Sequence, residues 1–163
     1  GPHDLSISGR WLAHCLNKHL PCNKPMPELQ SLPSRLIELR PKGAQIRARL
    51  RLREELPGEC RFVTLSHCWG KGHTYSLRSD ILSAFRTDIP GEQLPRTFQD
   101  AISVTHELGL SYVWIDSLCI LQDSTSDWAD EAQRMAGVYG SASLNIAATA
   151  STSSDAGLLI GHD

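Results

Sequence analysis

The sequence lacks any apolar run of the roughly 18–20 residues that a membrane-spanning helix needs. It also lacks an excess of one charge, because 16 lysines and arginines stand against 18 aspartates and glutamates. Binding to phosphates of nucleic acids depends on a strongly basic surface. We therefore expect neither a membrane span nor a nucleic-acid partner. No secretory signal is visible, and Gly1-Pro2 is typical of the remnant of a removed tag.

Cysteines are too few for a disulfide scaffold. The five of them are odd in number and show no dense framework of the kind found in small secreted proteins. We therefore expect a reducing environment and a cytoplasmic location. The remaining composition is that of an ordinary folded chain, with 40% hydrophobic residues over 163 positions. This length suits one domain with its own core.

The chain over 61–163 alternates between strand and helix patterns, which predicts an α/β core. The order strand, helix, strand is typical of parallel strands joined by right-handed crossovers. We expect one parallel sheet flanked by helices. The predicted strands are 62–66, 112–120 and 143–148, and the predicted helices are 80–85, 95–108 and 127–139.

Residues 3–60 predict an extension that packs on this core. A short helix is expected at 8–20, with Trp11 and Cys15 on one face, followed by a proline-rich loop. Two alternating stretches around a Pro-Lys-Gly turn then predict a β-hairpin. Arginines at every second position of its second strand favour a solvent-facing side over a nucleic-acid patch. They are Arg47, Arg49, Arg51 and Arg53.

Polar side chains that can carry chemistry follow the predicted strands. In open α/β sheets, ligands bind beyond the carboxyl ends of the strands, so these groups are expected to meet in one crevice. The alternative is that they only mark the passage from strand to loop. The candidate ligand-binding residues are Ser66, His67, Trp69, Gly70, Cys119, Gln122, Asp123 and Trp128, and Asp116 is a candidate catalytic residue.

Glu131 falls inside the apolar arc of the 127–139 helix, between Trp128 and Val138 in angle. A carboxylate there must be hydrogen-bonded, paired or functional, because burying it alone is too costly. Two interpretations stay open. Glu131 is a second catalytic residue beside Asp116, or it is a structural partner for an arginine or for backbone amides.

Cys15, His19 and Cys22 are three metal-ligand types within eight residues, and His14 is a further candidate. No second cysteine pair stands at zinc-finger spacing, however, and Pro21 constrains the turn. The sequence therefore favours local packing against the domain, and we predict no metal site.

A thiol nucleophile is a further alternative for the crevice. His67 and Cys68 are adjacent on a strand end, so their side chains point apart. A cysteine–histidine pair would have to join Cys119 to His67 across the two strands.

Five stretches of the chain together resemble the HET domain, the fungal heterokaryon-incompatibility module. FVTLSHCWG (62–70), LPRTFQDAISVTHELGLSYVWIDSLCILQD (94–123) and DWADEAQRMAGVYGSASLNIAAT (127–149) resemble its core. WLAHCLNKHLPC (11–22) and LPSRLIEL (32–39) resemble its lead-in. The resemblance implies a single HET domain that acts in non-self recognition and triggers programmed cell death when incompatible cells fuse.

The HET family is in turn distantly similar to TIR domains, whose sheet is parallel and flavodoxin-like. Many TIR domains cleave NAD with a glutamate, which implies NAD as a substrate here, no bound cofactor, and catalytic parts for Glu131 and Asp116. The TIR glutamate lies one helix later, where this chain has only Asp155 and Asp163 after Ala148. The alternative is a non-enzymatic signalling module that forms homo-oligomers or recruits other signalling domains.

Overall fold

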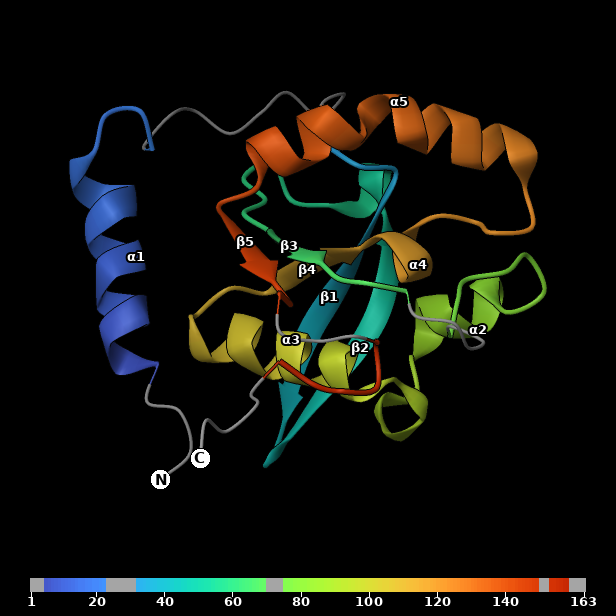
Figure 1. The fold of residues 1–163 in the computed structure, drawn as a ribbon, viewed down its shortest axis with the longest axis horizontal. Coiled ribbons are helices and arrows are strands. Elements are labelled where there is room, and N and C mark those ends of the chain that lie inside the picture. Colours follow the sequence, from blue (N-terminus) through green and yellow to red (C-terminus); the bar gives the residue numbers. More distant parts are fainter. Residues whose placement is uncertain (1–4, 23–31, 70–74, 150–152, 159–163) are drawn as a thin grey trace.

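A computed structural model describes residues 5–22, 32–69, 75–149 and 153–158. Within them a mixed sheet of five strands, in the order β2-β1-β4-β3-β5, lies between helices α3 and α5 (Figure 1). The strands are β1 (Arg35–Lys42), β2 (Gln45–Leu52), β3 (Val63–Ser66), β4 (Tyr112–Ile115) and β5 (Leu144–Ala147). The helices are α1 (Ser6–Lys18), α2 (Leu82–Thr87), α3 (Arg96–Glu107), α4 (Asp116–Cys119) and α5 (Thr125–Ser141), with short 3-10 helices η2 (Arg53–Glu55) and η3 (Gly91–Gln93).

Strands β3, β4 and β5 are parallel, which confirms the predicted α/β core. Val63 pairs with Val113 of β4 on one side and with Leu144 of β5 on the other. The chain therefore runs from β3 to one neighbour and then crosses back to the other, as at the reversal point of a doubly wound sheet. Ligands of such sheets bind beside this reversal, at the carboxyl ends of the strands.

The two helices that connect the parallel strands cover opposite faces of the sheet. Phe98 of α3 contacts His67 just after β3, with ring centroids 4.9 Å apart. Tyr139 of α5 contacts Trp114 of β4 on the other face, at 5.6 Å. Buried aromatic rings thus lie on both faces of the sheet, so its central strands have little access to water.

The predicted hairpin forms, but it does more than pack on the core. Gly43, at φ +62°, turns the chain between β1 and β2, a conformation that glycine adopts without strain. Strand β1 also pairs antiparallel with β4, placing Ile37 opposite Val113, so the hairpin extends the central sheet. Arg49 pairs with Glu38 at 2.5 Å on the polar side of the hairpin, where both side chains are only partly exposed. Arg53, the last of the predicted arginine series, lies beyond β2 in η2.

The predicted strand 112–120 is too long. Strand β4 ends at Ile115, and the next four residues form the helical turn α4. Asp116 starts this turn, since its Oδ1 accepts a hydrogen bond from the backbone N–H of Ser117 at 2.7 Å. Aspartate disfavours strands and stabilises the free N–H groups of a helix start. After Asp116 and Ser117 the apolar residues resume with Leu118, Cys119 and Ile120, which is why the sequence resembles one longer strand.

Helix α5 begins earlier than predicted, and its cap is not Asp127. The side chain of Ser124 accepts a hydrogen bond from the N–H of Asp127 at 3.3 Å and caps the helix. The Asp127 carboxylate instead accepts from the N–H of Leu121 at 2.8 Å and forms an ion pair with Arg35. Asp127 therefore ties the start of α5 to the start of β1.

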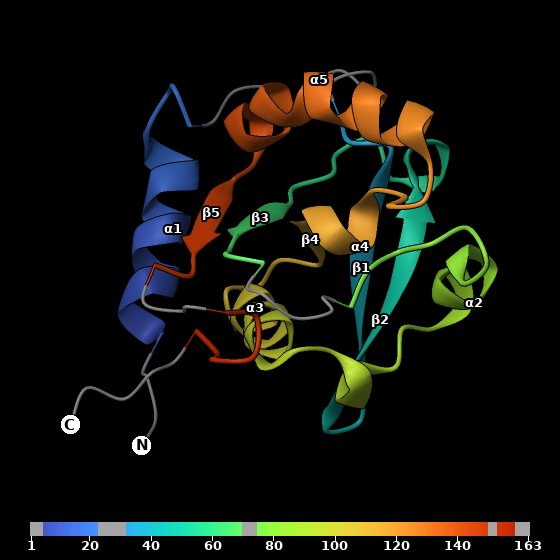
Figure 2. The same cartoon turned by 45° about the vertical axis from the view of Figure 1, so that its right-hand side comes forward.

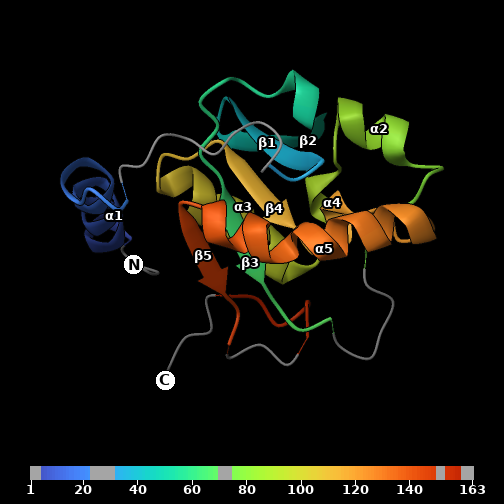
Figure 3. The ribbon, with the colours of Figure 1, turned by 90° about the horizontal axis from the view of Figure 1, so that it is seen from above.

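Helix α1 lies outside the layers of the sheet. Figure 2 shows it beside β5, and Figure 3 shows it apart from the other helices at one end of the molecule. None of its residues is fully buried. Of the predicted face, Trp11 is 72% exposed, whereas Leu12 is partly buried and packs against the core. Among the described helices, none combines the length and the apolar character that crossing a membrane requires.

Candidate functional site

Three of the predicted site residues meet at the carboxyl ends of β3 and β4. Asp116 follows β4 directly, and His67 and Trp69 follow β3. The indole N–H of Trp69 donates to Asp116 Oδ2 at 3.0 Å. The parallel pairing of the two strands brings these side chains together, because it aligns their carboxyl ends. We refer to Asp116, His67 and Trp69 as the edge cluster.

His67 is the buried member of the edge cluster. Its side chain is 1% exposed, and its Nδ1 lies 3.8 Å from Asp116 Oδ1, too far for a hydrogen bond. Neither ring nitrogen has a hydrogen-bond partner among the described residues. Burial lowers the pKa of His67, and the Asp116 charge opposes this only in part. The imidazole is therefore neutral at pH 7, with a donor and an acceptor that described residues do not satisfy.

Trp69 is the exposed member. Its ring lies nearly parallel to that of His67, with centroids 6.3 Å apart, and the residue is 40% exposed. The hydrogen bond to Asp116 fixes the indole, so a partly exposed flat ring lies beside a carboxylate. Such a surface can stack on the ring of a planar ligand. Gly70, also predicted for the site, lies outside the described residues.

Tyr139 and Ser66 adjoin the edge cluster from the α5 side. Burial raises the pKa of Tyr139, and the nearby charge of Asp116 raises it further, while a hydrogen bond with the Ser66 side chain acts in the opposite direction. Ser66 is exposed at the last position of β3. Sequence reasoning missed Tyr139 because it counts as apolar in a helical arc. Its hydroxyl was the only signal that could have marked it.

Gln122 and Asp123 shape the loop after α4. Gln122 Nε2 donates to the carbonyl of Ile120 at 3.0 Å and that of Asp116 at 3.4 Å. The Asp123 carboxylate accepts from the N–H of Ser79 at 3.0 Å, which lowers the pKa of Asp123. Gln122 therefore supports the backbone of Asp116 directly, whereas Asp123 ties this loop to the segment before α2.

Cys119 is fully buried in α4. Burial raises the pKa of its thiol to about 12, so the thiol is protonated at physiological pH. No hydrogen bond joins Cys119 to His67 within the described ranges. A thiol nucleophile needs a lowered pKa or an adjacent base, so these contacts do not favour the cysteine–histidine alternative.

Glu131 is buried, as its place in the apolar arc predicts, with 1% of its surface exposed. Its carboxylate accepts hydrogen bonds from the side chain of Ser34 and, at 3.4 Å, from the Ser34 N–H. Arg134 approaches it to 4.0 Å, and Arg53 donates to the same serine hydroxyl at 3.2 Å. Glu131 thus joins α5 to the residue that precedes β1. No hydrogen bond or ion pair between described residues links it to Asp116.

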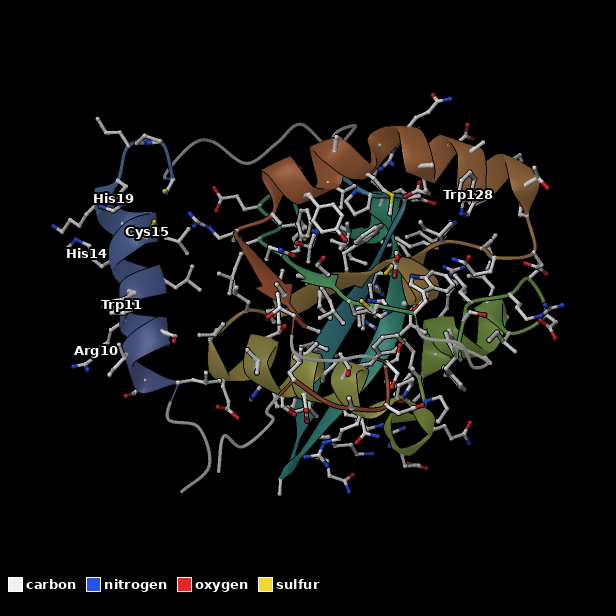
Figure 4. All side chains as sticks on the ribbon, viewed as in Figure 1. Arg10, Trp11, His14, Cys15, His19 and Trp128 are labelled. Atoms are coloured by element: carbon white, nitrogen blue, oxygen red, sulfur yellow. The ribbon has the colours of Figure 1, made fainter. Side chains whose placement is uncertain are left out.

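Trp128 departs from the expected arc. It is 56% exposed on the first turns of α5, and Figure 4 shows its side chain at that end of the helix. The apolar arc is therefore buried only farther along α5, where Val138 contributes to the core.

A hollow of about 500 Å³ opens on another part of the molecule. It lies between β2, the loop after α2 and α3, and its lining includes Arg47, Asp88, Gln99 and Ser103. None of the predicted site residues lines it. The edge cluster is therefore defined by its contacts rather than by this hollow.

A protein-family model matches the segment of the chain that contains the edge cluster. The family model described as "Heterokaryon incompatibility protein (HET)" matches residues 62–162, more than half of the chain. The chain belongs to the heterokaryon incompatibility (HET) family. No curated protein and no solved structure matches the chain. Membership supports a function related to heterokaryon incompatibility, and the edge cluster lies within the HET segment.

Proposed function

We propose that this HET domain is an effector of fungal heterokaryon incompatibility that promotes cell death by hydrolysing a nucleotide such as NAD at the bond between nicotinamide and ribose. One observation carries the proposal. At the carboxyl ends of two parallel strands, Trp69 is hydrogen-bonded to the Asp116 carboxylate and lies over His67, which is buried and unpartnered among described residues. Carboxylate, flat ring and sheet edge together suit a substrate that carries a planar, positively charged nicotinamide ring.

Two members of the edge cluster, Asp116 and Trp69, take part in the proposed reaction. The bond between C1′ of the ribose and the nicotinamide nitrogen breaks, and its electron pair leaves with nicotinamide. Water supplies the oxygen that bonds to C1′, and its proton is released. Asp116 supplies negative charge opposite the ribosyl cation as it develops, a form of electrostatic stabilisation that strengthens where water is excluded. Trp69 stacks on a ring of the substrate.

The reversal of strand order beside β3 supports a ligand site at this edge. The distant resemblance of HET domains to TIR domains supports NAD as the substrate. Glu131, the other catalytic residue expected from the sequence, is given no catalytic part in this scheme. Its hydrogen bonds with Ser34 support a structural role, so we assign the catalytic charge to Asp116.

The test is to incubate the purified chain with NAD at several protein concentrations and to follow nicotinamide and ADP-ribose by chromatography. We expect equal amounts of both products, and a specific activity that rises with protein concentration if self-association completes the active form. The absence of nicotinamide release at every concentration would remove the enzymatic proposal.

Exposed apolar side chains favour a second candidate function, a signalling module that works by self-association. Trp11 and Ile7 on α1 and Trp128 on α5 are large apolar residues exposed to solvent. If this function is the correct one, Trp11→Ala and Trp128→Ala reduce both the oligomer fraction and cell death. Asp116→Asn then leaves both unchanged.

A further inference from the structure

Three potential metal ligands gather at the C-terminal end of α1. Cys15, His19 and Cys22 each offer one donor atom, and these atoms all lie within 4.8 Å of one another. The helix places Cys15 and His19 one turn apart on the same face, and Figure 4 shows both at the same end of α1. After the helix the chain turns, and the N–H of Cys22 donates to the carbonyl of His19 at 3.0 Å. This turn brings the sulfur of Cys22 close to that of Cys15.

Packing on the core, which the sequence favours, reaches only one of the three donors: Cys15 is half-buried, as is Leu12, which packs against the core. None of the residues of α1 is buried, and His19 and Cys22 are exposed. Free cysteine is usually among the most buried residues, so two cysteines that meet at the surface beside a histidine need another explanation. Coordination of a metal ion supplies one.

We propose that Cys15, His19 and Cys22 form a zinc site, with the two sulfurs and one imidazole nitrogen as protein ligands and water in the fourth position. Thiolate and imidazole are the ligands that structural zinc prefers, at about 2.3 Å and about 2.0–2.1 Å. The two sulfurs lie 3.1 Å apart. A tetrahedral ion with such bonds separates its sulfurs by roughly 3.8 Å, so small side-chain rotations admit it.

A disulfide between Cys15 and Cys22 is the competing arrangement. Its sulfurs would approach to about 2.05 Å, and it would make no use of the imidazole. A divalent cation releases the thiol protons as it binds, because the thiolate is the form that acts as a ligand. His19 lies beside the two cysteines, and this favours a bound metal ion over a disulfide.

The experiment titrates the reduced, metal-free chain with Co²⁺ and then with Zn²⁺. We expect one Co²⁺ per chain, with a thiolate-to-cobalt charge-transfer band and the ligand-field bands of tetrahedral cobalt, both of which Zn²⁺ removes. His19→Ala and Cys22→Ser should weaken binding at least about tenfold, since even the outer partners of metal ligands are worth roughly 10–100-fold. His106→Ala is the matched control, because this histidine is exposed on α3 and is not among the clustered donors.

Two results would overturn the proposal. One is the absence of a thiolate–cobalt band in the reduced chain. The other is equal metal affinity in the wild type, His19→Ala and Cys22→Ser. Loss of fold does not confuse the comparison, because α1 contributes no buried residue, and unchanged melting temperatures of the metal-free variants check this. The experiment is independent of nucleotide hydrolysis, so each proposal stands or falls alone.

Discussion

Two carboxylates beside the sheet, Glu131 and Asp116, differ in their exposure to solvent. Glu131 is enclosed, and both of its oxygens accept from Ser34. Asp116 also accepts hydrogen bonds with both oxygens, from the indole N–H of Trp69 and from the N–H of Ser117, but its side chain stays 16% exposed at the sheet edge. Both carboxylates therefore hold elements together, and only the charge of Asp116 lies at the surface.

Replacing Glu131 by glutamine should therefore lower stability. The hydrogen bonds with Ser34 then involve a neutral amide, and the negative charge 4.0 Å from Arg134 is lost, at a cost of about 1–3 kcal/mol in the free energy of unfolding. Asp130→Asn, on an exposed neighbouring position of α5, should change it by less than about 0.5 kcal/mol. Denaturant titration of both variants gives the comparison, and equal stability of the two would contradict the structural role.

His67 should make stability depend on pH. Burial lowers its pKa in the folded chain below the value of about 6.5 in the unfolded chain. As pH falls through about 6.5, the unfolded chain binds the proton first, so the free energy of unfolding decreases until the folded pKa is passed. His67→Phe should remove this decrease. The aromatic replacement should be tolerated, because neither nitrogen has a hydrogen-bond partner among the described residues.

The check is a series of thermal or denaturant unfolding curves between neutral and mildly acidic pH. His106→Gln, at an exposed position of α3, serves as the control and should keep the wild-type dependence. The same pH dependence in His67→Phe as in the wild type would show that another group is responsible.

The cysteines should differ sharply in reactivity. Cys119 is buried with a thiol pKa raised to about 12, whereas Cys68 is exposed. In the native chain a thiol reagent should label Cys68 quickly and Cys119 only after denaturation, since the thiolate is the reactive form. Mass spectrometry of the labelled peptides decides this. Labelling of Cys119 as fast as Cys68 would revive the thiol-nucleophile alternative.

At the residue scale, the helical pattern correctly predicts that Glu131 is buried. It cannot predict the partner, because Ser34 lies 97 positions earlier in the chain and reaches Glu131 only through the tertiary fold. The meeting of His67, Trp69 and Asp116 was predictable, because parallel strands align their carboxyl ends. Tyr139 was not, since an amphipathic residue counts as apolar in a helical pattern.

At the scale of elements, α1 has no buried residue, whereas three of the four residues of β4 are buried. Trp11 of α1 is 72% exposed, whereas Trp114 of β4 is fully enclosed. Trp114→Ala should cost roughly 3–5 kcal/mol through lost burial and a cavity, and Trp11→Ala should cost less than about 0.5 kcal/mol. Unfolding curves of the two variants test whether α1 contributes to the core. A large loss in Trp11→Ala would show that it does.

Elements with a strong local pattern were predictable, and those set by distant contacts were not. The hairpin and helix α3 follow from alternation and from helical spacing. The antiparallel pairing of β1 with β4 joins segments that are far apart in the sequence, so no local pattern reveals it. Helix α4 was missed because its apolar residues continue the pattern of the preceding strand.

At the scale of the whole molecule, the parallel strands and the hairpin form one sheet, while α1 lies outside its layers. The HET segment, 62–162, contains all three parallel strands and the edge cluster. The hairpin covers the β4 edge of that segment by antiparallel pairing. The proposed chemistry therefore belongs to the HET segment, and the proposed zinc site lies outside it.

The most direct test of this account compares nicotinamide release from NAD by the wild type, Asp116→Asn and Glu131→Gln, each corrected for its folded fraction. Asp116→Asn keeps shape but removes the charge at the sheet edge, so we predict that it abolishes turnover while the chain stays folded. Glu131→Gln should lower the melting temperature yet retain turnover per folded molecule. Retained turnover in Asp116→Asn, or a folded but inactive Glu131→Gln, would contradict the assignment of the catalytic charge to Asp116.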